Sequence, residues 1–117
     1  MVKVIRELVG SRVRDTSYDD RVRIRLAAPG TGGTEGAATD LVLETEFRLR
    51  VADGQYLDML PGTGSELAPV LDLFGQVVTA VERAADGSFV IAFDAGSLLW
   101  IASDARFGLS PVPRARG

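Results

Sequence analysis

The alternation of apolar and polar residues along this chain predicts mainly short strands. Val22, Ile24 and Leu26 alternate with three arginines, and apolar residues recur at nearly every second position over 41–51. A period of two turns one side of a strand toward the core and the other toward solvent. We therefore predict a strand at 21–26 and a long, continuous strand at 41–51.

Apolar residues spaced three or four positions apart predict two short helices. The first is expected over 2–9 and ends at Gly10, and the second begins after the N-cap Ser65 and ends at Gly75. Glycine often follows the last helical residue because it readily adopts a left-handed backbone. In the second helix the predicted buried stripe includes Leu71 and Phe74.

The second half of the chain is predicted to form two consecutive hairpins. Its strands are expected at 77–82, 89–93 and 98–102. The segments between them, Asp86-Gly87 and Asp94-Ala95-Gly96, are typical turn sequences.

Three further segments complete the prediction. A short strand is expected at 56–59, a flexible loop at the glycine-rich stretch 29–39, and a disordered tail at 111–117. The glycines of the loop miss the spacing of phosphate-binding motifs, and a strand rather than a helix follows them. The loop is therefore not expected to bind phosphate.

The two halves show the same order of elements, which predicts an internal repeat at approximately 1–60 and 64–110. Leu8-Val9-Gly10 precedes Val13 just as Leu73-Phe74-Gly75 precedes Val78. We predict a single α+β domain, 1–117, in which a helix plus a three-stranded antiparallel meander is duplicated. The product would be one twisted sheet or a partly closed barrel with two short helices. Chance likeness between two meanders is the alternative.

Six short motifs follow one another along the chain: Leu8 to Val13 (L-x-G-x-x-V), Leu41 to Leu49 (containing E-x-x-F-x-L), Asp53-Gly54, Leu71 to Val78, Asp86 to Phe89, and Phe93 to Gly96 (compare F-x-D-G). Their order resembles that of a family of small actinobacterial proteins of unknown function. The chain departs from the family pattern in its longer glycine-rich insertion, in Ala95, and in Arg106-Phe107, where tryptophan is more usual. The resemblance implies a shared fold and no particular activity.

The composition argues against most common enzyme designs. The chain contains no cysteine and no histidine, so it lacks a thiol nucleophile, thiolate zinc ligands and the most frequent general base. The paired carboxylates Asp19-Asp20 are interpreted as a turn rather than as a metal or glycosidase site. We therefore predict no enzymatic activity, no cofactor and no metal site.

Charge and hydropathy point to a cytoplasmic protein. The formal net charge is -3, and the first residues include no long apolar run. Arg21, Arg23 and Arg25 could line a nucleic-acid groove, but no aromatic residues alternate with them to stack on bases. We interpret them as a solvated face opposed by Glu44 and Glu46 on the next strand, and we expect neither nucleic-acid nor membrane binding.

The second half lacks such charged protection, which predicts a binding surface there. If its strands turn one face to the core, the opposite face carries small and apolar residues that a monomer would be expected to cover. A homodimer is the favoured occupant, and the tail around Phe107 and Leu109 or closure of the sheet are the alternatives. The candidate interface residues are Val78, Ala80, Val90, Ala92, Leu98 and Trp100.

These observations favour a small binding or protein-interaction domain, of the immunity-type or accessory kind, with a possible protein partner. The alternative is a small-ligand-binding domain, or an enzyme that uses Asp, Glu, Arg or Tyr in a pocket that the sequence does not reveal.

Overall fold

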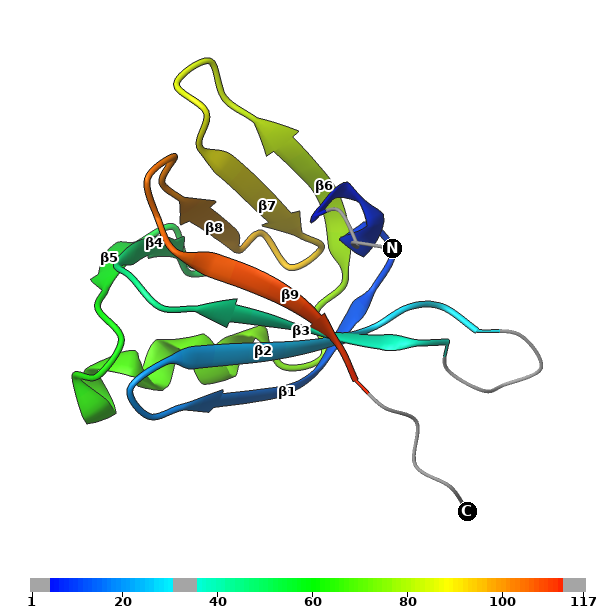
Figure 1. The fold of residues 1–117 in the computed structure, drawn as a ribbon, viewed down its shortest axis with the longest axis horizontal. Helices are drawn as coiled ribbons and strands as arrows, with labels where there is room; N and C mark the ends of the chain where they lie inside the picture. The colour runs from blue at the N-terminus through cyan, green and yellow to red at the C-terminus, as the bar shows by residue number, and fades with distance from the viewer. Residues whose placement is uncertain (1–4, 31–35, 113–117) are drawn as a thin grey trace.

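The chain folds into two antiparallel sheets (Figure 1). The computed structural model describes residues 5–30 and 36–112. Sheet A contains, in spatial order, β1 (Arg12–Tyr18), β2 (Val22–Ala27), β3 (Ala38–Leu43) and β9 (Phe107–Pro111). Sheet B contains β5 (Tyr56–Met59), β4 (Phe47–Arg50), β8 (Leu98–Ile101), β7 (Phe89–Phe93) and β6 (Val78–Arg83).

The predicted α+β class with a duplicated helix is wrong, because the fold is mostly β with two sheets. Within the described residues the helical segments are 3₁₀: η1 (Ile5–Leu8) and η2 (Gly64–Leu73). In η2 the buried residues Leu67, Val70 and Leu73 lie exactly three positions apart, which matches the three-residue turn of a 3₁₀ helix. Leu71 and Phe74, which the sequence placed in the buried stripe, are 44% and 60% exposed.

The predicted continuous strand at 41–51 is divided between the two sheets. β3 ends at Leu43 and β4 begins at Phe47, so residues 44–46 carry the chain from sheet A to sheet B. Alternation keeps its phase across this crossing, since Leu41, Leu43, Phe47 and Leu49 are all buried. Both sheets turn their inner faces to one core, and a pattern of buried positions does not reveal a change of sheet.

The chain crosses back between sheets after β8. After β8 the chain leaves sheet B, and β9 pairs with β3 in sheet A. In exchange, β4 from the first half of the chain pairs with β8 in sheet B. Figure 1 shows β9, in orange, lying along β3 on the side of sheet A that faces β8. The sequence missed β9 because Gly108, Ser110 and Pro111 have low strand propensity.

Reciprocal backbone hydrogen bonds connect the segment around the start of β1 in sheet A with the segment around the start of β6 in sheet B. The Gly10 N–H donates to the Val78 carbonyl over 2.8 Å, and the Gly75 N–H donates to the Val13 carbonyl over 2.9 Å. Both glycines have positive φ, 90° and 84°, a conformation that other residues rarely adopt. These bonds connect the two segments on which the internal repeat was based; the repeat itself stays a prediction.

One hydrophobic core lies between the inner faces of the sheets and the two 3₁₀ segments. Its fully buried side chains come from both sheets and from η1 and η2. The larger ones are Leu8, Ile24, Leu26, Leu41, Leu43, Leu49, Leu67, Leu73, Ile91, Leu99 and Ile101.

The remaining boundaries agree with the sequence to different degrees. β5 and β7 lie where they were predicted, and β6 and β8 lie within one residue of the expected positions. The predicted loop 29–39 is too long, because Ala38 and Thr39 belong to β3. Its residues 31–35, the predicted helical residues 2–4 and the tail residues 113–117 lie outside the described part, and Pro111 ends β9.

Candidate functional site

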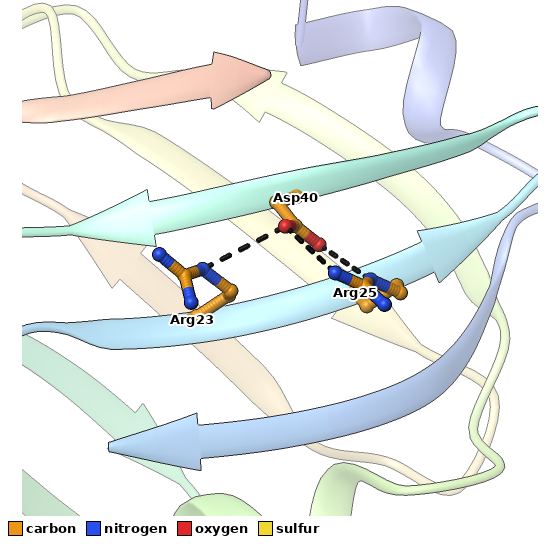
Figure 2. Close-up of polar contacts among 3 residues, drawn as sticks. All are labelled: Arg23, Arg25 and Asp40. Atoms are coloured by element: carbon orange, nitrogen blue, oxygen red, sulfur yellow. Dashed lines mark hydrogen bonds and ion pairs between the residues drawn. The ribbon is translucent and has the colours of Figure 1, made fainter. Parts of the chain in front are cut away.

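The outer face of sheet A carries a compact ion-pair cluster (Figure 2). Arg25 donates two hydrogen bonds to Asp40, from Nε to Oδ1 over 2.9 Å and from NH2 to Oδ2 over 3.2 Å. Arg23 Nε lies 3.6 Å from Asp40 Oδ2. The hydrogen bond to Asp40, reinforced by its charge, raises the pKa of Arg25 above the ordinary arginine value. Asp40 is thus a carboxylate held between two guanidinium groups.

The predicted partners of this arginine face were wrong. In the register of β2 and β3, Arg25 lies opposite Asp40 and Arg23 lies opposite Val42. Glu44 and Glu46 both lie in the crossing between the sheets, between the end of β3 and the start of β4. The interpretation of the arginines as a salt-bridged face fits these pairs, although the carboxylate comes from within β3.

The outer face of sheet B has a different character. Alternate residues of its five strands form cross-strand rows. The Trp100 row contains Asp58, Arg48, Trp100, Val90 and Glu82. The Leu98 row contains Tyr56, Arg50, Leu98, Ala92 and Ala80. On the other side of the Trp100 row, just outside the ends of β4, β8 and β7, lie Glu46, Ala102 and Ser88, which line one pocket with Trp100 and which we call the Ala102 row.

An aromatic and arginine cluster lies at the β5–β4–β8 side of this face. The Tyr56 and Trp100 ring centroids are 5.6 Å apart at an interplanar angle of 42°, and the Arg50 guanidinium lies 5.9 Å from the Tyr56 ring centroid. Tyr56 is 56% exposed and Trp100 is half-buried. Aromatic faces of this kind remain accessible to a partner.

The charged residues of this face divide into paired and unpaired groups. Arg48 Nε donates to Asp58 Oδ1 over 2.9 Å, and this hydrogen bond raises the pKa of Arg48. Within 5–30 and 36–112, neither Arg50 nor Glu46 forms an ion pair. The Nε atom of Arg50 is buried without a hydrogen-bond partner in this part of the chain. A buried donor without an acceptor is energetically costly.

A shallow groove of about 460 Å³ runs along the Ala102 end of the face. Its lining includes the small residue Ala102, the rings of Trp100 and Tyr56, the Arg48–Asp58 pair, and the carboxylates of Glu46 and Asp86. The Ser88 hydroxyl and backbone N–H both donate to Asp86 Oδ1, at 2.7 and 3.0 Å, which lowers the pKa of Asp86. The groove therefore combines an aromatic wall with fixed negative charge.

Five of the six predicted interface residues lie on this face, in the Trp100 and Leu98 rows. Val78 does not: it is 1% exposed and belongs to the core. The register shifts between Val78 and Ala80, so that one extra residue, Thr79, bulges out of β6. A bulge reverses the alternation of faces, and the sequence pattern therefore assigned Val78 and Ala80 to the same side.

The predicted internal cover for this face is absent from the described residues. β9, which carries Phe107 and Leu109, lies at the edge of sheet A, and both side chains pack against the core. The sequence also missed the residues that β4 and β5 add, namely Arg48, Arg50, Tyr56 and Asp58. Their contribution depends on the exchange of β4 into sheet B, for which no local sequence signal exists.

The described part of the chain contains neither a metal-ligand cluster nor a membrane-spanning helix. No group of three or more Asp, Glu, His or Cys side chains is placed to bind a metal ion there. No helix among these residues has the length and apolar character needed to cross a membrane.

Comparison with known proteins identifies a family without assigning an activity. No curated protein and no solved structure is significantly similar to the chain. One family model, described as a family of unknown function (DUF6188), matches residues 4–108, in agreement with the expectation of such a family from the sequence motifs. Since this match covers nearly the whole sequence, the chain belongs to the DUF6188 family.

Proposed function

We propose that this protein is a protein-interaction module that binds its partner through the outer face of sheet B. The observation that carries the proposal is the cluster of Trp100, Tyr56, Arg48 and Arg50. Trp, Tyr and Arg are the residue types that most often dominate the binding energy of protein interfaces. Next to this cluster lies a low apolar surface that consists of Val90, Ala92 and Leu98. Apolar surfaces of this kind are found at the centres of protein interfaces.

The outer face of sheet A supports the choice by contrast. There the carboxylate of Asp40 already has both Arg23 and Arg25 as partners, so a binding protein would have to displace satisfied ion pairs. On sheet B, Arg50 and Glu46 form no ion pair among the described residues, and the surface beside them combines the Arg48–Asp58 pair with the aromatic rings of Trp100 and Tyr56. Binding there costs less desolvation of paired charge.

Site-specific photo-crosslinking tests this function in cells that produce the protein. A photo-reactive amino acid replaces Val90, in the Trp100 row, and in a matched variant it replaces Arg23 on sheet A. We expect protein adducts from position 90 and few from position 23, because only the first position would lie in an interface. Adding Trp100→Ala to the position 90 variant should abolish the adducts.

Equal adduct yields from positions 90 and 23, or no protein adduct from position 90, would overturn the proposal. Circular dichroism of each purified variant establishes that the fold is preserved. Mass spectrometry of the adduct identifies the partner and shows whether it is another protein or a second copy of this chain.

A further inference from the structure

We propose that the partner is a second copy of this chain, bound about a two-fold axis that runs across the strands along the Trp100 row. This inference rests on the proposed function and names its partner. A face-to-face homodimer brings the same surface of both copies together, so every contact of one residue with another occurs twice. The question is whether the sheet B face is complementary to itself.

The rows of this face provide that complementarity. With the axis along the Trp100 row, the Leu98 row of one copy lies over the Ala102 row of the other, strand for strand. Arg50, at the end of β4, then faces Glu46 of the partner subunit, because Glu46 directly precedes β4 and lies on the other side of the axis. On β8, Leu98 faces Ala102 of the partner subunit, so a large side chain enters the groove above a small one.

Trp100 and Arg48 on the axis and the residues at the β5 edge fit the same arrangement, whereas Glu82, at the β6 end of the axis, faces its own copy. Trp100 meets Trp100 of the partner subunit, and Arg48 meets its own copy with its charge already balanced by Asp58. At the edge, Tyr56 and Leu60 lie near opposite ends of β5, and they are 56% and 51% exposed. Each would cover the other residue of the partner subunit, which removes two large exposed side chains per copy from water.

A different axis gives a poorer match. A two-fold axis along β8 would place the arginines of β4 over the apolar β7 residues of the partner subunit, Val90 and Ala92. The unpaired guanidinium of Arg50 would then be buried without a carboxylate, which is unfavourable. Packed sheets cross at an angle of about 30°. The Arg50–Glu46 contact tolerates this angle because both residues lie close to β8, the central strand of sheet B.

Charge reversal followed by restoration tests this arrangement. Sedimentation equilibrium at micromolar concentration should find the wild-type protein as a dimer. Glu46→Arg should raise the dimer dissociation constant about 100-fold, because the substitution sets like charges against each other at two symmetric places. Arg50→Glu should have a similar effect. The double variant E46R/R50E exchanges the two charges and should return the constant to within about tenfold of the wild-type value.

Glu44→Arg is the matched control, since it makes the same change of charge at an exposed residue in the crossing between sheets. It should alter the dissociation constant by less than about threefold. The inference is overturned by a monomeric wild-type protein, by a double variant as weak as the single ones, or by equal effects of Glu44→Arg and Glu46→Arg.

The failure of this inference can be distinguished from a failure of the proposed function. A monomeric protein that still forms Trp100-dependent crosslinks with a different protein would contradict the homodimer and leave the interaction module standing. If substitutions of Glu46 and Trp100 leave the dimer unchanged, and position 90 forms no crosslinks, both the homodimer and the proposed function are contradicted.

Discussion

A chain that ends after Ala105 is expected to be strongly destabilised and to unfold at a much lower urea concentration than the full chain. The truncation removes β9, which forms five cross-strand pairs with β3, from Thr39–Pro111 to Leu43–Phe107. It also removes Phe107, whose ring lies 6.0 Å from that of Phe89 in an edge-to-face contact. The loss of two large packed side chains and one edge of sheet A should cost more than about 4 kcal/mol. Domains of this size have only about 5–15 kcal/mol of stability.

Circular dichroism and urea titration measure this effect. A chain lacking only residues 113–117 retains all of β9 and is the control, for which we expect an unchanged unfolding midpoint. If the truncation after Ala105 unfolds at the same urea concentration as this control, β9 does not contribute to the fold as described.

Replacing Leu99 by alanine is expected to lower the free energy of unfolding by about 3 kcal/mol. Leu99 is fully buried in β8, and its register neighbours are Leu49 on β4 and Ile91 on β7. Because it lies at the middle of sheet B with core on its inner side, truncation leaves a cavity that neighbouring strands cannot easily close.

Leu98→Ala is the matched control, because it removes the same atoms from the adjacent residue on the outer face. It should cost less than about 1 kcal/mol in the monomer. Urea titrations of both variants must be made at low protein concentration, since dimer formation would add to the apparent stability. Equal losses for the two variants would mean that the inner and outer faces of β8 have been assigned incorrectly.

The sequence predicted strands well where buried alternation coincided with clear turns. The hairpin strands of the second half lie within one residue of their expected positions, and β5 lies where it was expected. The helices were predicted at approximately the right places but in the wrong class. Spacings of three and four residues are compatible with both α and 3₁₀ geometry when a segment is short.

The arrangement of strands in two sheets could not be predicted, because the exchange of β4 and β9 is a tertiary event. Alternation of buried residues continues through residues 44–46 although the chain changes sheets there. The same exchange explains why the candidate site was only partly found. Val90, Ala92, Leu98 and Trp100 belong to the hairpins that the sequence revealed, whereas the arginines and Tyr56 come to the same face from the first half.

The error at Val78 has a separate cause. A single-residue bulge at Thr79 separates Val78, which is buried, from Ala80, which is on the outer face. Bulges carry little sequence signal when the residue is neither glycine nor proline. Of the residues predicted for the interface, Val78 therefore lies in the core, and the interface itself stays a prediction.

Fluorescence quenching of Trp100 tests the central claim, that the outer face of sheet B is a binding surface for a second copy, most directly. The chain contains one tryptophan, so its emission reports on the centre of this face alone. With acrylamide, a neutral quencher, we expect efficient quenching in dilute protein and weaker quenching as the concentration rises into the micromolar range. Glu46→Arg should stay efficiently quenched throughout that range. Quenching of the wild-type protein that does not change with concentration would contradict the account.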